Sequence, residues 1–198
     1  MTLPPRTAHV ERATNETTVS VTLDLDGEPG SDCQTGVGFL DHMLDLLARH
    51  GRMNLTVKAD GDLEVDDHHT VEDVGICIGQ ALGQALGDKA YVARYGEATI
   101  PMDETLARAV IDLSGRAHLT FHAPLDRERV GDLSTDMVEH FWWSVAEHAR
   151  VTMHLDVLRG RNDHHRIEGL FKAAARAIRQ AVTRDPGGDP LPSTKGAL

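Results

Sequence analysis

Two segments of this 198-residue chain repeat the same short pattern almost a hundred residues apart. Asp67–Glu72 and Asp163–Glu168 both read Asp-His-His-x-x-Glu, and each leads into a run of helix-forming residues. The His-His pairs are offset by 96 residues (164 minus 68), and the lone histidines His42 and His140 by 98 (140 minus 42). A chain that repeats one pattern at a nearly constant offset is predicted to fold as two copies of one unit.

The periodicity of apolar residues predicts the same order of elements in both halves. In the first half we expect strands at Thr17–Leu25 and Met53–Ala59 and helices at Phe39–Gly51 and Thr70–Leu86. In the second half we expect strands at Ala107–Leu113, Ala117–Phe121 and Val151–Leu158 and helices at Thr135–Arg150 and Asn162–Val182. The second half reads strand, strand, helix, strand, helix. We predict this order for both halves, so the fold class is α+β with an internally duplicated β-β-α-β-α unit.

The chain is expected to form a single domain made of two pseudo-repeats and a tail. The repeats span about residues 8–93 and 94–184, and the tail spans residues 185–198. Gly75, Gly79 and Gly83 lie at every fourth position of the helix predicted in the first repeat. Because glycine lowers helix propensity, this row is expected to pack closely against a neighbouring backbone.

Composition narrows the class of protein. The net charge of −11 argues against binding to nucleic acid, since phosphate backbones repel an acidic surface. The chain has no stretch of about eighteen apolar residues, so no membrane span is predicted. Met1–Glu11 lacks the apolar core of a secretion signal. Cys33 and Cys77 are the only cysteines, so no disulfide framework is implied. A cytoplasmic protein is the resulting expectation.

The duplicated histidines and glutamates are predicted to bind metal. Neighbouring residues diverge by about 100° around a helix, so the two histidines of each pair should face different ions. Adding one lone histidine per half gives four ligands for each of two ions. The candidate ligands are His42, His68, His69, Glu72, His140, His164, His165 and Glu168. Imidazole and carboxylate donors without a thiolate favour an octahedral ion such as Mn²⁺, with two positions open, over structural zinc.

Five motifs together resemble one known family. They are Phe39–Met43, Asp67–Asp73, His140–Trp142, Asn162–Lys172 and Ser193–Gly196. This set resembles the imidazoleglycerol-phosphate dehydratase family in its monofunctional form, over essentially the whole chain. The departures, Trp142-Trp143 and Gly169, concern packing and leave the candidate ligands intact.

The resemblance implies a fold whose halves are like domain 2 of ribosomal protein S5, assembled as a homo-oligomer of 24 subunits. It also implies two Mn²⁺ ions per active site, with the sites between subunits. The reaction implied is that of a carbon–oxygen hydro-lyase in L-histidine biosynthesis. Imidazole glycerol phosphate loses water and becomes imidazole acetol phosphate.

The resemblance also assigns roles to residues outside the metal set. Glu16 is the first candidate for the catalytic acid or base and also a substrate contact, and Asp103 is the second candidate. Family positions that bind substrate or phosphate are matched by Arg94, Arg116 and Lys195, with Ser193 and Thr194 as hydroxyl donors. Two further substrate-binding candidates are Lys172, nearby on the second metal helix, and His50, through its repeat partner His148. Composition alone favours an unstructured tail, whereas the resemblance makes its Ser-Thr-Lys a phosphate clamp.

Two alternative functions are compatible with the metal pattern. A di-metal hydrolase acting on a phosphorylated metabolite would fit the number of ions, although such enzymes usually bridge their ions with carboxylates. A non-catalytic metal-buffering or assembly protein would also fit, and it would not require Arg94, Arg116 or Lys195.

Overall fold

The computed structural model describes residues 4–188, 191 and 193. The first repeat contains β1 (Thr7–Ala13), β2 (Thr17–Asp24), β3 (Gly30–Gln34), α1 (Gly38–Gly51), β4 (Asn54–Gly61) and α2 (His68–Leu86). The second contains β5 (Tyr95–Met102), β6 (Thr105–Asp112), β7 (His118–His122), β8 (Arg129–Val130), β9 (Leu133–Ser134), α3 (Asp136–Ala149), β10 (Thr152–Arg159) and α4 (Asp163–Ala181).

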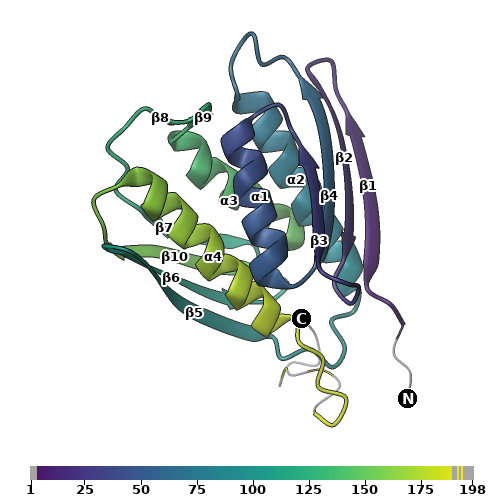
Figure 1. Cartoon of the computed structure of the whole chain (residues 1–198). Coiled ribbons are helices and arrows are strands. Elements are labelled where there is room, and N and C mark those ends of the chain that lie inside the picture. The colour runs from purple at the N-terminus through teal and green to yellow at the C-terminus, as the bar shows by residue number, and fades with distance from the viewer. Residues whose placement is uncertain (1–3, 189–190, 192, 194–198) are drawn as a thin grey trace.

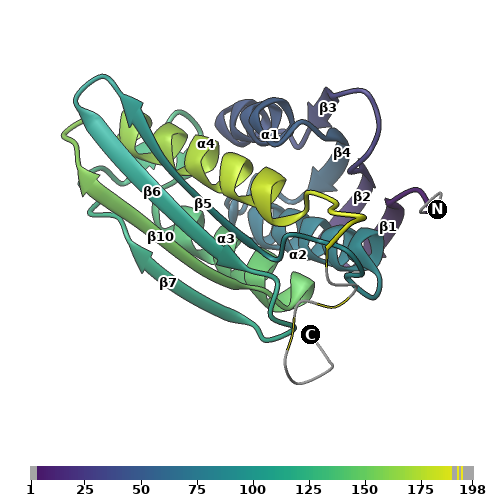
Figure 2. The same cartoon turned by 90° about the horizontal axis from the view of Figure 1, so that it is seen from below.

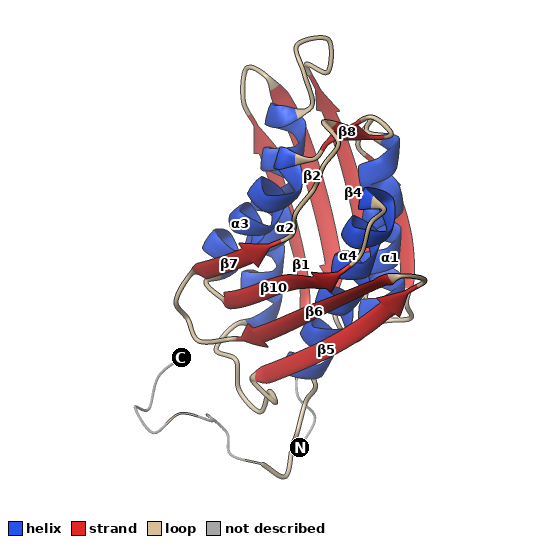
Figure 3. Ribbon diagram, turned by 90° about the vertical axis from the view of Figure 1, so that its left-hand side faces the viewer, coloured by secondary structure: helices blue, strands red, loops and turns tan. Residues whose placement is uncertain are grey.

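Within the described residues, the two large sheets have the same topology. Their strand orders are β1-β2-β4-β3 and β5-β6-β10-β7, and in each the last pair is parallel while the others are antiparallel. The four helices lie between these sheets (Figure 1), and the strands of the sheets run in different directions (Figure 3). The predicted duplicated α+β fold is confirmed.

The predicted ranges lack β1 and β3 in the first repeat, and β5 and the short β8 and β9 in the second. β1 and β5 are the first strands of their repeats. Both lie at the edge of a sheet. β1 presents His9 and Glu11 outward, which weakens its apolar signal, as is common for edge strands. β5 contains Gly96 and Pro101, which resemble strand breakers. A Cβ atom at Gly96 would lie 1.9 Å from the Ala177 carbonyl oxygen, so the glycine permits close approach of α4.

Two glycines of the predicted row, Gly75 and Gly79, pack closely against a neighbouring backbone, as the sequence predicted. A Cβ atom at Gly75 would lie 3.0 Å from the Phe141 carbonyl oxygen, and one at Gly79 would lie 2.8 Å from the Val145 carbonyl oxygen. Both acceptors belong to the backbone of α3, so the glycines allow α2 and α3 to pack backbone to backbone. α4 packs in the same layer against α1 (Figure 2).

One connecting segment, residues 123–135, joins the starts of three helices. Asp132 accepts hydrogen bonds from the Gly38 and Phe39 amides at the start of α1 (2.6 and 2.9 Å). Asp67, just before α2, accepts from the Ser134 amide (2.6 Å). Asp163, the first residue of α4, accepts from the Arg127 amide (2.8 Å). These bonds fix the relative positions of the helix ends that carry the paired histidines.

Candidate metal centre and active site

The first group of candidate ligands lies between α1 and α4. His42 projects from α1, while His164 and Glu168 lie one turn apart on α4. The Glu168 Oε2 atom is 3.0 Å from the His164 Nε2 atom and 3.4 Å from the His42 Nε2 atom. One ligand atom from each residue lies within 4.8 Å of the others, which is a separation that a single cation can bridge.

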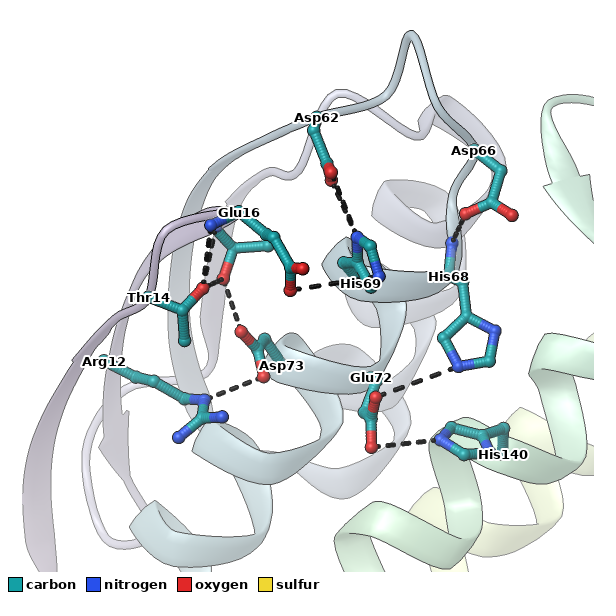
Figure 4. Close-up of polar contacts among 11 residues, drawn as sticks. Arg12, Thr14, Glu16, Asp62, Asp66, His68, His69, Glu72, Asp73 and His140 are labelled. Atoms are coloured by element: carbon teal, nitrogen blue, oxygen red, sulfur yellow. Dashed lines mark hydrogen bonds and ion pairs between the residues drawn. The ribbon is translucent and has the colours of Figure 1, made fainter.

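The second group lies between α2 and α3 and repeats the first. His68 and Glu72 lie on α2, and His140 projects from α3. The Glu72 carboxylate is 3.8 Å from His68 Nε2 and 3.3 Å from His140 Nε2 (Figure 4). The His140 Nε2 atom is buried and has no hydrogen-bond partner among the described residues. A buried imidazole nitrogen directed at a carboxylate without a hydrogen bond suits shared coordination of a metal.

Each group takes ligands from both repeats. Repeat one supplies His42 to the first group, and repeat two supplies His140 to the second. The duplication therefore does not produce one closed site per half. It produces two sites that each need both halves.

The second histidine of each pair points away from these groups, as the helical geometry predicted. The His68 and His69 rings are inclined at 75°, and the His164 and His165 rings at 88°. His69 Nδ1 lies 3.0 Å from the Asp62 carboxylate, and its Nε2 lies 3.8 Å from Glu16 (Figure 4).

His165 repeats this arrangement in the second half. Its Nδ1 atom lies 2.8 Å from the Glu104 carboxylate, and its Nε2 atom lies 3.9 Å from Asp103. Glu16 and Asp103 both lie in hairpins, β1–β2 and β5–β6, so the two candidate acids occupy related positions. The sequence did not identify Asp62 or Glu104. Only Glu104 had a neighbouring signal, the adjacent Asp103.

The electrostatics of the first group favour the ionised carboxylate that a cation binds. Burial opposes ionisation of Glu168, but hydrogen bonds from Lys172, His164 and His42 hold the pKa of that carboxyl below its usual value. The hydrogen bond to Asp62 raises the pKa of His69. Hydrogen bonds from the His165 ring and from two backbone amides lower the pKa of Glu104 strongly. The donors are imidazole and carboxylate, which fits Mn²⁺ or another divalent ion of similar hardness.

Two of the predicted phosphate-binding residues share a cavity. His50 and Lys172 line a cavity of about 440 Å³ between the end of α1, the middle of α4 and β5. Arg176, one turn beyond Lys172, lines it as well. Burial and the charges of Lys172 and Arg176 lower the pKa of His50. Lys172 Nζ also lies 2.5 Å from Glu168 Oε1, which links this cavity to the first metal group.

The arginines predicted to bind phosphate lie at the opposite ends of the helices. The Arg94 amide donates to the Ala181 carbonyl at the end of α4, seventeen residues (181 minus 164) or about 25 Å beyond His164. The Arg94 side chain binds Asp112 through two nitrogens (2.8 and 3.2 Å). Arg116 is exposed just beyond β6.

The C-terminal candidates are only partly within the described residues. Ser193 is half-buried, and its amide donates to the Leu191 carbonyl (2.6 Å). Thr194 and Lys195 lie outside the described residues. Among the helices that the structure describes, none combines the length and the apolar composition that crossing a membrane requires.

The fold and the site define a class of protein: an internally duplicated α+β chain with paired imidazole–carboxylate groups suited to divalent cations. A family model described as imidazoleglycerol-phosphate dehydratase matches residues 35–178. A dehydratase of that name from Salinibacter ruber is 62% identical, covering 98% of this chain and 96% of the relative. A dehydratase of the same name from Streptococcus mutans is 55% identical, covering 98% of this chain and 100% of the relative.

Solved structures agree with this match. A crystal structure of imidazoleglycerol-phosphate dehydratase from Staphylococcus aureus has a TM-score of 0.82 and 45% identity, covering 90% of this chain and 99% of that one. The Pyrococcus furiosus enzyme has a TM-score of 0.82 and 30% identity, covering 96% of this chain and 100% of that one. The chain belongs to the imidazoleglycerol-phosphate dehydratase family, whose members are hydro-lyases.

Proposed function

We propose that this chain carries out the manganese-dependent dehydration of D-erythro-imidazole glycerol phosphate to imidazole acetol phosphate and water. The reaction would serve L-histidine biosynthesis in the cytoplasm. Family membership supports the reaction, and the donor chemistry supports the metal. The observation that carries the proposal is the pair of three-residue groups, each with its ligand atoms within 4.8 Å and each built from both repeats.

We propose two Mn²⁺ ions per active site. Each three-residue group would hold one ion, and His69 and His165 supply the two further donors that make four ligands per ion. Within one chain, those two histidines are directed toward Glu16 and Asp103 instead. Their outward direction supports a site completed by neighbouring copies of the chain, in which His69 and His165 of adjacent subunits contribute the remaining ligands.

The reaction requires two bonds to break. The hydroxyl on the carbon attached to the imidazole ring leaves and is protonated to water, and a proton leaves the next carbon. That carbon keeps its own hydroxyl, so the resulting enol becomes the ketone of imidazole acetol phosphate. Bound Mn²⁺ would supply Lewis-acid polarisation of ring nitrogen and substrate oxygen. Glu16 is the first candidate to move the proton, because its half-exposed carboxylate lies at the outward face of His69. Asp103 has the related position beside His165 and is the second candidate.

The phosphate would be held by cations from more than one subunit. His50 and Lys172 line a cavity linked through Glu168 to one metal group. Arg94 lies about 25 Å along α4 from His164, and a small substrate cannot span that distance. We therefore propose that Arg94 and Arg116 act on a substrate held by another subunit's metals, with Ser193, Thr194 and Lys195 as the C-terminal clamp. A homo-oligomer of 24 subunits is the assembly we propose.

The test is an assay of purified protein with imidazole glycerol phosphate, with added Mn²⁺ and after chelation. We expect the enol or ketone product to appear with Mn²⁺, to disappear after chelation and to return when Mn²⁺ is restored. Release of inorganic phosphate without ketone would instead support a di-metal hydrolase. For the clamp, a Lys195→Ala gene should fail to restore growth of a histidine auxotroph. Unimpaired growth would remove Lys195 from the site.

A further inference from the structure

The outward-facing histidines differ from the clustered ones in the ring nitrogen that faces a carboxylate. His69 and His165 each have a carboxylate on the Nδ1 atom, at 3.0 and 2.8 Å. The clustered histidines instead face Glu72 or Glu168 through their Nε2 atoms. In the outward pair, the Nδ1 partner leaves Nε2 as the nitrogen that faces away from the helix.

Glu104 is held in place on both of its oxygens. The Oε1 atom accepts hydrogen bonds from the Arg161 and Asn162 amides, both at 2.9 Å. The Oε2 atom is thereby directed at His165 Nδ1. The Glu104 side chain is only 26% exposed, whereas the adjacent Asp103 side chain, near His165 Nε2, is 81% exposed. Two consecutive acids therefore face the two nitrogens of one imidazole, and only Glu104 is fixed by the backbone.

Asp62 has the corresponding place in the first repeat but comes from a different element. It lies in the connection between β4 and α2, and its oxygens are 3.1 and 3.0 Å from His69 Nδ1. The Asp62 amide donates to the Glu16 carbonyl (3.2 Å), which ties this acid to the β1–β2 hairpin. Glu104 comes from the β5–β6 hairpin. The same contact is thus made from unrelated positions in the two repeats, so duplication of the chain does not account for it.

We propose that Asp62 and Glu104 are positioning residues for metal binding. Each accepts a hydrogen bond from the Nδ1–H group of its histidine, which fixes the ring orientation and leaves the Nε2 lone pair available to a cation. Carboxylates that orient a ligating imidazole in this way also make the imidazole a stronger donor. This inference rests on the proposed function, because it takes His69 and His165 to be metal ligands.

The experiment is a titration of the metal-free, full-length protein with Mn²⁺, followed by electron paramagnetic resonance of free Mn²⁺. The variants are Asp62→Ala, Asp62→Asn, Glu104→Ala and Glu104→Gln. Loss of such a contact typically weakens metal binding by about 10- to 100-fold. We expect that weakening for the alanine variants. The amide variants keep an acceptor without its charge, so they should lie between alanine and the unaltered chain.

Asp60→Ala and Glu147→Ala are the matched controls, because both side chains are exposed and make no hydrogen bond or ion pair among the described residues. Their Mn²⁺ affinity should be unchanged. Circular dichroism of each metal-free variant checks folding, and the amide variants provide the test if an alanine variant does not fold. Unchanged affinity in folded Asp62 and Glu104 variants would overturn the proposal.

His69→Ala and His165→Ala separate failure of this inference from failure of the proposed function. If these variants lose Mn²⁺ while the Asp62 and Glu104 variants retain it, the histidines are ligands that need no positioning acid. If the histidine variants themselves bind Mn²⁺ normally, the proposed ligand set is wrong, and the inference falls with it.

Discussion

Adjacent histidines in this protein take different partners because a helix separates neighbouring side chains by about 100°. His68 faces Glu72 and His140, whereas His69 faces Asp62 and Glu16. One short segment therefore directs candidate ligand atoms in two directions. A chain that builds a site with copies of itself can use one direction internally and the other for a neighbour.

The ion pair between Arg6 and Asp26 predicts how stability depends on pH. The hydrogen bonds from Arg6, which is buried, and the nearby Arg184 hold the pKa of Asp26 below its usual value. Because the folded pKa is below the unfolded value of about 3.9, this stabilisation is present above that value. It is lost as pH falls through the lower, folded pKa.

Asp26→Asn should therefore lower the free energy of unfolding by about 1–2 kcal/mol at pH 7. The difference from the unaltered chain should shrink as the pH falls below about 4. Urea denaturation of the metal-free protein between pH 3 and 7 measures both, with Asp60→Asn as the control. A difference that stays constant across this pH range would contradict the assignment.

The sequence predicted the clustered candidate ligands and missed the acids around them. His42, His68 and Glu72 were predictable because their spacing is repeated in the second half and their chemistry is specific to metals. Asp62 and Glu104 had no repeated spacing, because each repeat brings its acid from a different element. Only the folded chain places them beside a histidine.

The packing of α2 on α3 gives a prediction with an internal control. A Cβ atom at Gly79 would lie 2.8 Å from the Val145 carbonyl oxygen and 2.9 Å from the His148 Cβ atom. A Cβ atom at Gly83, one turn further along, would meet no neighbour closer than 3.5 Å. Alanine is intrinsically better than glycine in a helix by about 1 kcal/mol, so both substitutions carry the same intrinsic gain.

Gly79→Ala should nevertheless destabilise the protein, because overpacking against a rigid backbone costs about 1–3 kcal/mol. Gly83→Ala should be neutral or stabilising by up to about 1 kcal/mol. Thermal unfolding followed by circular dichroism compares the two variants. Equal effects on the midpoint would show that the α2–α3 contact does not require glycine at residue 79.

At the scale of elements, the helices were predictable because apolar residues recur along α1 and α4 at helical spacing. The edge strands were not. Charged residues in β1 and Gly96 in β5 are favourable only because of where these strands lie, one facing solvent and the other against α4. Local sequence does not record that placement, so the predicted repeats lacked the edge strands β1, β3 and β5.

At the scale of the molecule, the site residues lie at opposite ends of the helix layer. Glu16 contacts His69 at the start of α2. Lys89, just beyond the end of α2, donates to the Leu113 carbonyl, three residues before Arg116. The nineteen residues of α2 span about 28 Å, so Glu16 and Arg116 of one chain lie too far apart to act on one small molecule.

If active sites are shared between subunits, two inactive variants should restore activity when they assemble together. We expect Glu16→Gln and Arg116→Ala to be inactive alone, each with normal Mn²⁺ binding, since neither belongs to a three-residue metal group. In randomly mixed oligomers, about a quarter of the sites would combine an intact Glu16 from one subunit with an intact Arg116 from another. Dehydratase activity of the mixture should then approach about a quarter of that of the unaltered protein.

The mixture is prepared by chelating the metal, combining the two variants and restoring Mn²⁺, and light scattering before and after each step follows the mass of the particle. Each variant taken alone through the same steps is the control and should stay inactive. If Glu16 and Arg116 acted within one chain, every mixed site would carry a defect, and no activity would return. That outcome, in particles of restored mass, would place the whole active site in one subunit and contradict the shared arrangement.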